Sequence, residues 1–360
     1  NTAGELVAPN NRRPGRPYDG KSAKAAIIGG RGPHIEPQGL TGHEGKKATG
    51  SNCSQLAACG LPPTDMFDCI ASGRVIINGD DFGMSPGINA AVQRLHQAGR
   101  LNSVSIMTNM PWSANALAYA EQAPNLRAGV HLNLSTGRPL LPPDHVPSLV
   151  DHEGQFLPIS ALLSRLLAGR VDWSDLRHEL EAQIELALDA LQPSAAESGR
   201  TIEHLDSHMH FHAVPTLGRL VSDLALYYGV PAVRNPDFAA FVMPPPSEIG
   251  PVRNALQKAG TRVLVSTQRA LSGKNIALNE PPAATRQLVY LRWCLEPGPN
   301  PPAETFRSCI CDLEADNLEI IAHPAEMDDV LPSLSGYVDG RQMEYDFLAG
   351  DDFGEMLETL

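Results

Sequence analysis

The sequence predicts an α/β fold of the β/α-barrel type, and three observations lead to this class. Strands and helices alternate from residue 74 onward, which is typical of parallel strand pairing. Polar residues follow the ends of the predicted strands, where a β/α barrel gathers its functional side chains. A chain of 360 residues with 42% hydrophobic content can also bury the core that one large α/β domain needs.

The predicted elements follow one another in regular order. The first strand, at 75–77, ends near Asp80 and Asp81, and the next helix has Ser85 as its N-cap, proline in its first turn and Gly99 at its end. Periodicity and turn residues place the remaining elements. They are strand 103–109, helix 113–123, strand 127–135, helices 159–169 and 173–191, an extended stretch ending at 212, helix 216–229, and strands near 231–236, 262–267 and 318–324.

Residues 1–72 differ in composition from the rest of the chain. They carry 8 Lys and Arg against 6 Asp and Glu, whereas the remainder carries 20 against 35, and they hold 11 of the 31 glycines without any sustained period. We expect a low-complexity, largely disordered extension here and a single β/α-barrel domain over residues 73–360. Met66 is the first methionine, so we expect a natural start there.

Composition also restricts the partners. A formal net charge of −13 disfavours nucleic acid and anionic membranes, which reward clustered Lys and Arg, and favours a neutral or cationic small substrate. No apolar run approaches the length of a membrane span. The six cysteines show no C-x-x-C spacing, which favours free thiols in a reducing compartment. A cytoplasmic protein is therefore expected.

The stretch "DSHMHFH" is the least ordinary part of the sequence. If its backbone is extended, His208, His210 and His212 share one face. A solvated strand end is the alternative, but three imidazoles within five residues, just after Asp206, favour metal chemistry. One or two of them would bind the metal, and the others would orient ligands or contact substrate.

Two further positions complete a candidate metal site. Asp80 and Asp81 are adjacent anions that repel each other. Such a pair is tolerated when it is solvated, when it caps another element, or when a cation or a shared proton neutralises it. A turn with a helix cap is an equal alternative for this pair alone. His131 ends another predicted strand, where a lone histidine is more often structural. Taken with the histidines of "DSHMHFH", these residues favour a His-His-Asp metal shell.

Two more candidate site residues are supported only by the predicted barrel. Arg234 in "VRNP" could be a surface charge, and His323 in "IIAHP" could simply end a strand before proline. A barrel would bring both to the same mouth as the metal site. The second "DDFG", at 351–354, follows no apolar strand, and we expect it to form a surface turn.

The order of these motifs resembles a known family. "INGDDFG", "GVHLNLSTGRPL", "HLDSHMHFH", "VRNP" and "IIAHP" occur in the order seen in the YdjC-like carbohydrate deacetylases, relatives of the chitooligosaccharide deacetylases, from about residue 74 to 360. The resemblance implies a deformed β/α barrel related to polysaccharide deacetylases. It also implies hydrolysis of the N-acetyl group of an amino sugar. Subtypes in hopanoid-associated pathways share these motifs, so the substrate stays open.

The resemblance also implies roles for individual residues. Asp81, His131 and His208 resemble the ligands of a divalent metal, Asp80 resembles the catalytic base, and His323 resembles the histidine that would act as the acid. The family implies magnesium, although two imidazoles suit zinc or another transition metal better.

Other residues would support this reaction. Arg234 would orient the base or bind substrate oxygens, and His210 or His212 would contact substrate or protonate the amine. The Pro-rich excursion at 136–158 is a candidate lid because it follows a metal ligand. The expected partner is an acetylated amino sugar or oligosaccharide, and a homodimer is possible.

Two other functions fit the same residues, and a third does not. A metal-dependent hydrolase of the same fold could act on another amide, an ester or a phosphoester, including a hopanoid-pathway substrate. A non-catalytic metal-binding or sugar-binding protein would use the same residues. A glycosidase is disfavoured because its two carboxylates must face each other across the scissile bond.

Overall fold

The computed structural model describes residues 75–191, 201–234, 241–242, 287–295, 301–310 and 318–359. The expectations for residues 1–72, including a start at Met66, lie outside these residues, as does the strand predicted at 262–267.

In the part of the chain that the structure describes, seven strands form one sheet in the order β4-β3-β2-β1-β7-β6-β5. All neighbours in this sheet are parallel, as the alternation of strands and helices predicts. The strands are β1 (Val75–Phe82), β2 (Ser103–Ile106), β3 (Arg127–Leu132), β4 (Leu205–Ser207), β5 (Phe241–Val242), β6 (Gln287–Tyr290) and β7 (Leu318–Ala322).

The strand order is that of a deformed β/α barrel. The sheet runs from β1 to β4 in sequence order, and Val233 adds a parallel bridge beyond β4 at Leu205. On the other side of β1, it runs back through β7 and β6 to β5. Among the described residues the wall is open between Val233 and β5. The predicted barrel class is confirmed in this curled, open form, which still places all strand ends at one face.

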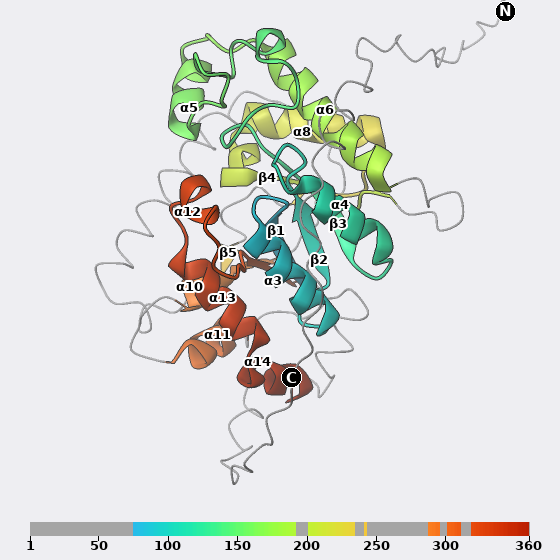
Figure 1. The fold of residues 1–360 in the computed structure, drawn as a ribbon, viewed down its shortest axis with the longest axis vertical. Coiled ribbons are helices and arrows are strands. Elements are labelled where there is room, and N and C mark those ends of the chain that lie inside the picture. Colours follow the sequence, from blue (N-terminus) through green and yellow to red (C-terminus); the bar gives the residue numbers. More distant parts are fainter. Residues whose placement is uncertain are drawn as a thin grey trace, which may run out of the picture. The chain divides into compact units, whose positions relative to one another are not determined.

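Helices cover the sheet and its ends (Figure 1). They are α3 (Pro86–Gln97), α4 (Ser113–Gln122), α5 (Ile159–Leu167), α6 (Trp173–Leu191), α8 (Pro215–Tyr228), α10 (Leu291–Leu295), α11 (Pro302–Ile310), α12 (Leu331–Leu334), α13 (Asp339–Ala349) and α14 (Asp351–Thr359). Helix α3 begins as predicted: the Ser85 hydroxyl accepts a hydrogen bond from the Ile88 amide at 3.2 Å, and Pro86 occupies the first turn. It ends before Gly99, whose φ is +69°.

The core lies between the sheet and its helices. Ile77, Val104, Val130 and Ile320, from four neighbouring strands, are each 0% exposed, as expected for parallel strands covered on both faces. A second group of rings, Phe306, Phe347 and Phe353, joins α11, α13 and α14 with centroids 5.4–6.0 Å apart.

The prediction of a surface turn at the second "DDFG" is wrong. Asp351 and Asp352 form the first turn of α14, and Phe353 is fully buried. Acidic side chains stabilise a helix N-terminus by interacting with its dipole, so the same four residues that end a strand near residue 80 can begin a helix here.

The excursion at 136–158 is a packed layer. Val150 and Phe156 form an antiparallel bridge, and buried apolar side chains support it: Leu141, Val146, Leu149 and Leu157. Helix α6 anchors the excursion through Glu179, which accepts hydrogen bonds from the amides of Leu140 (2.9 Å) and Leu141 (3.0 Å).

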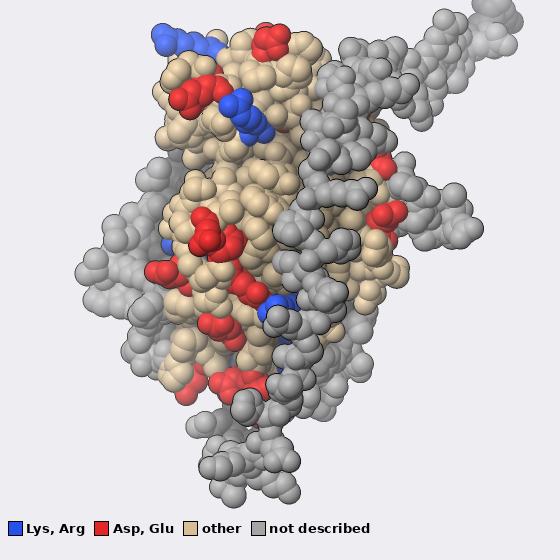
Figure 2. Space-filling view, in the orientation of Figure 1, with Lys and Arg blue, Asp and Glu red and all other residues tan. Residues whose placement is uncertain are grey.

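Acidic side chains are scattered over the C-terminal helices on the face shown in Figure 2, where Lys and Arg are few. Among the described residues, no helix has both the length and the apolar character needed to cross a bilayer.

Candidate active site

A pocket of about 370 Å³ opens at the carboxyl ends of the strands. Its lining includes the predicted site residues Asp80, Asp81, His131, His208, His210 and His323. Arg234 and His212 are not among the lining residues. Side chains that lie up to 243 positions apart in the chain, from Asp80 to His323, therefore meet because parallel strands end at one face.

A local distortion brings both adjacent aspartates into this pocket. Neighbouring side chains of a regular strand point to opposite faces. Asp81 has a left-handed backbone, with φ of 63°, and the pairing of β1 with β2 shifts register between Gly79 and Phe82. This bulge turns the chain, so Asp80 and Asp81 both line the pocket, and β1 ends in a functional pair.

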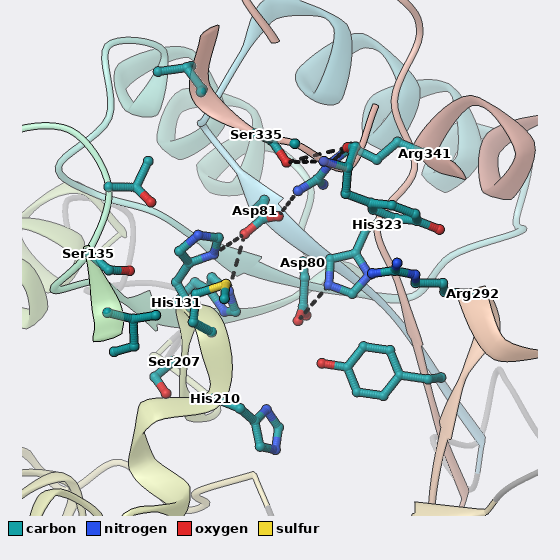
Figure 3. A pocket seen from close by; sticks show the side chains of 18 of the residues that line it. Asp80, Asp81, His131, Ser135, Ser207, His210, Arg292, His323, Ser335 and Arg341 are labelled. Atoms are coloured by element: carbon teal, nitrogen blue, oxygen red, sulfur yellow. Dashed lines mark hydrogen bonds and ion pairs between the residues drawn. The ribbon is translucent and has the colours of Figure 1, made fainter. Parts of the chain in front are cut away.

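Asp81 lies at the centre of the candidate metal site. Its Oδ1 is 2.9 Å from Nδ1 of His208 and 3.3 Å from Nε2 of His131, while its Oδ2 accepts a hydrogen bond from Arg341. Figure 3 shows Asp81 between His131 and Arg341, whereas Asp80 faces His323. Burial alone would raise the pKa of Asp81, but Arg341 and His208 outweigh it and hold the pKa well below its usual value.

Asp206 orients His131 from behind. Its Oδ1 lies 2.8 Å from Nδ1 of His131, which leaves Nε2 directed at Asp81. Burial would lower the pKa of His131, but Asp206 and Asp80 raise it to about 10. A carboxylate behind a ring nitrogen is the usual support of a metal-binding histidine, because it fixes the ring and raises its basicity.

These residues fit a divalent cation. One donor atom each of Asp81, His131 and His208 lies within 4.8 Å of the others, so a single ion could contact all three. The set combines one carboxylate with two imidazoles, one of them backed by Asp206. This donor set is typical of zinc and other transition-metal sites, whereas magnesium prefers oxygen ligands.

Arg234 holds Asp80 rigidly. Its two terminal nitrogens donate one hydrogen bond to each oxygen of Asp80, both at 2.8 Å, and the guanidinium also lies 2.7 Å from Asp206 and from Glu319. Burial would raise the pKa of Asp80, but Arg234 and then His131 lower it below its usual value. Arg234 is only 2% exposed, so its position favours orienting the base over binding substrate.

The histidines of "DSHMHFH" do not share a strand face, so that expectation is wrong. Strand β4 ends at Ser207, and His208–Ala213 forms a 3₁₀ helix with left-handed backbone at Met209 (φ 55°) and His210 (φ 54°). His210 lines the pocket, while His212 is buried with Nδ1 2.5 Å from the Ser207 hydroxyl. Left-handed backbone is uncommon for Met and His, so no residue type here signals the turn.

His323 lies on the other side of Asp80. Its Nε2 is 3.8 Å from Oδ2 of Asp80, and its ring stacks on Tyr290 with an interplanar angle of 13°. Burial lowers the pKa of His323 to about 4, although Asp80 and Asp81 oppose the shift. Once Asp80 has taken up a proton, the neutral ring beside it can accept that proton and pass it on.

Several pocket residues carry no sequence motif. Arg341 and Tyr337 from the C-terminal segment and Tyr290 from β6 line the pocket, but nothing in their spacing indicates a site. Asp206 lies outside the lining, and its place just before the histidine cluster already marks it in the sequence as a carboxylate beside a candidate metal ligand.

Comparison with known proteins identifies the family of the chain. Residues 74–359 match the family of YdjC-like proteins. The chain belongs to the YdjC-like family. Among its family relatives is the carbohydrate deacetylase of Thermoanaerobacter pseudethanolicus, 28% identical over 77% of this chain and 91% of the relative. Another is the carbohydrate deacetylase of Halalkalibacterium halodurans, 27% identical over 76% of this chain and 94% of the relative.

A solved structure supports the fold of this YdjC-like chain. It is a crystal structure from Enterococcus faecalis, described as a candidate cellobiose-phosphate cleavage protein, with 26% identity and a TM-score of 0.55. The similarity covers 79% of this chain and 93% of that protein.

Proposed function

We propose that this protein is a metal-dependent carbohydrate deacetylase that hydrolyses the N-acetyl group of an amino sugar of the chitooligosaccharide type. One observation carries the proposal: two adjacent carboxylates have separate surroundings. Asp81 faces two imidazoles, while Asp80 is held by Arg234 and faces His323. This division would supply a metal ligand and a base at neighbouring positions. The names of the relatives, carbohydrate deacetylases, support the proposed reaction.

Asp81, His131 and His208 would hold the cation. When bound, a divalent cation supplies Lewis-acid chemistry, since it polarises a carbonyl and makes water a stronger nucleophile. Asp206 keeps His131 in the orientation that this role requires. Because the donors include two imidazoles, we expect zinc, cobalt or nickel to bind more tightly than magnesium, the ion that the family resemblance implies.

Asp80 and His323 would move the proton. The lowered pKa keeps Asp80 ionised at neutral pH, so its carboxylate can take a proton from the attacking water. His323, 3.8 Å away, would pass a proton to the amine nitrogen as the C–N bond breaks. Water thus supplies the hydroxyl of the acetic acid and the proton of the amine.

The pocket suits part of a sugar. Tyr290 and Tyr337 provide aromatic surface, and Ser335 and His210 provide polar groups. A mixture of ring faces and hydrogen-bonding groups matches a polyol that has both apolar C–H faces and hydroxyls.

The test is release of acetate from diacetylchitobiose. The protein is stripped of metal with a chelator and then restored with magnesium, zinc, cobalt or nickel. We expect release that depends on the metal, and His208→Ala should abolish it. Asp80→Asn should also abolish release while cation binding by calorimetry persists, which separates an enzyme from a metal-binding protein.

An absence of acetate release with any of these ions would reject the proposed reaction. Cation binding without release would then direct the search to other amides and to esters.

A further inference from the structure

Glu344, on α13, is a buried carboxylate beside the pocket, and the reaction described above gives it no part. It is 0% exposed. Its Oε2 accepts the backbone N–H of His323 at 2.5 Å, and its Oε1 accepts the hydroxyl of Tyr337 at 2.7 Å. One side chain therefore fixes both the end of β7 and a ring that flanks His323.

The ring of His323 has a carboxylate facing each nitrogen. Nε2 lies 3.8 Å from Oδ2 of Asp80 on the pocket side, and Nδ1 lies 3.9 Å from Oε1 of Glu344 behind. Tyr290 stacks parallel to the ring, and Tyr337 packs edge-on with centroids 6.2 Å apart. The aromatic rings restrict rotation, so Nδ1 stays directed at Glu344.

A histidine with a buried carboxylate behind one ring nitrogen is a recurring catalytic arrangement. The rear carboxylate fixes the tautomer of the ring and stabilises the imidazolium that forms when the front nitrogen takes a proton. The distance of 3.9 Å is longer than a hydrogen bond, and such contacts are often long without substrate and shorten when it binds.

We propose that Glu344 is a positioning residue for His323, which keeps the ring proton on Nδ1 and stabilises the imidazolium formed by protonation at Nε2. The inference rests on the proposed function for the destination of that proton. As the C–N bond breaks, its electron pair goes to nitrogen, Nε2 donates its proton there, and His323 returns to the neutral form.

The surroundings of Glu344 and His323 agree with a positive charge on His323 that exists only during the reaction. Burial raises the pKa of Glu344 to about 7, and burial lowers that of His323 to about 4, so an ion pair is disfavoured at rest. The groups that face His323 are Asp80 and Asp81 from β1, His131 from β3, Tyr290 from β6, Tyr337 before α13, and Arg341 and Glu344 from α13. Arg341 and Glu344, three residues apart, share one face of their helix.

The first test reads the ring directly and needs no activity. Protein labelled with ¹⁵N on histidine is compared with Glu344→Gln by NMR, with His323→Asn to assign the signal. We expect the Nδ1-protonated tautomer in the unsubstituted protein, and a mixture of tautomers with a lower His323 pKa in Glu344→Gln. Identical ring shifts and an identical pKa in the two proteins would overturn the proposal.

The second test uses two leaving groups. We expect Glu344→Gln to lower kcat on diacetylchitobiose roughly 10- to 100-fold, with KM within about twofold. Hydrolysis of p-nitrophenyl acetate should fall less than about twofold, because nitrophenolate leaves without a proton. Equal losses on both substrates would indicate a merely structural role and overturn the proposal.

Glu179→Gln is the matched control, since Glu179 is also 0% exposed, accepts backbone N–H groups and has a pKa raised by burial to about 7. It does not face His323, so the ring shifts of His323 should not change. If the unsubstituted protein releases no acetate from the sugar, the proposed function fails, while the NMR comparison still decides the role of Glu344.

Discussion

Arg234 and Asp80 meet through two parallel hydrogen bonds of 2.8 Å, with both residues about 2% exposed. The same guanidinium lies 2.7 Å from Asp206 and from Glu319. One buried cation thus contacts three carboxylates. Asp80 is the proposed base, and Asp206 supports the proposed metal ligand His131. Arg234 therefore links the proton-transfer group to the metal-binding group.

Removal of this cation should therefore affect both stability and activity. Arg234→Met leaves buried carboxylates unpaired, and we expect it to lower the free energy of unfolding by about 3–5 kcal/mol in urea titrations. Arg234→Lys keeps the charge but loses the two-pronged contact with Asp80, so activity should fall even where folding is retained.

Arg94→Met is the control for the loss of a surface cation. Arg94 pairs with Glu326 at 2.7 Å, but its side chain is 65% exposed, so we expect a loss below about 1 kcal/mol. Equal losses for Arg94→Met and Arg234→Met would contradict the central place given to Arg234.

The barrel and most of its mouth could be predicted from sequence because they depend on local patterns. Alternating strands and helices fix parallel pairing, and parallel pairing brings Asp80, His131, His208 and His323 to one face. The helix boundaries at Ser85 and Gly99 follow from capping chemistry, which depends on a few neighbouring residues.

The remaining parts of the site depend on tertiary contacts. Arg341 reaches Asp81 across 260 positions, and Glu344 meets His323 from a helix without any motif. The left-handed backbone at Asp81, Met209 and His210 occurs without glycine. Such conformations are set by the surrounding packing and not by local preference, so the extended arrangement expected for the histidine cluster was wrong.

Asp206→Asn should weaken metal binding without removing a proposed ligand. The substitution exchanges the carboxylate at Nδ1 of His131 for an amide, which supports the ring less firmly and lowers its basicity. We expect the affinity for zinc to fall roughly 10- to 100-fold by calorimetry. Because Asp206 also contacts Arg234, far-UV circular dichroism should first show that the variant is folded. An unchanged affinity in a folded variant would contradict the assignment of His131 as a ligand.

Glu179 should make stability depend on pH in a defined direction. Burial raises its pKa to about 7 in the folded protein from 4.5, despite hydrogen bonds from Gln183, Leu140 and Leu141. Between these values the folded state binds more protons than the unfolded state, so this residue lowers stability as the pH rises from 4.5 through 7.

The comparison with Glu179→Gln isolates this contribution, because glutamine does not titrate. We expect the stability of the unsubstituted protein, relative to the variant, to decrease in urea titrations at pH 5, 6.5 and 8. A relative stability that stays level or increases over this range would show that Glu179 does not titrate as described.

Met209→Gly should stabilise the protein. Met209 has φ of 55° and is 61% exposed, so its left-handed backbone is unfavourable and burial of its side chain offsets little of this energy. The left-handed backbone costs about 1–2 kcal/mol per residue. Glycine removes this cost, but ordering its more flexible backbone on folding costs roughly 0.5–1 kcal/mol in conformational entropy. We expect a net gain of a few tenths to about 1 kcal/mol in the free energy of unfolding, measured by urea titration.

Gly229→Ala is the reciprocal control. Gly229 has φ of 68°, and a β-carbon at this position would meet nothing within 4 Å, so alanine should lower stability through backbone conformation alone. A loss of stability in Met209→Gly would mean that contacts of the methionine side chain, and not the packing around His208 and His210, hold this turn in place.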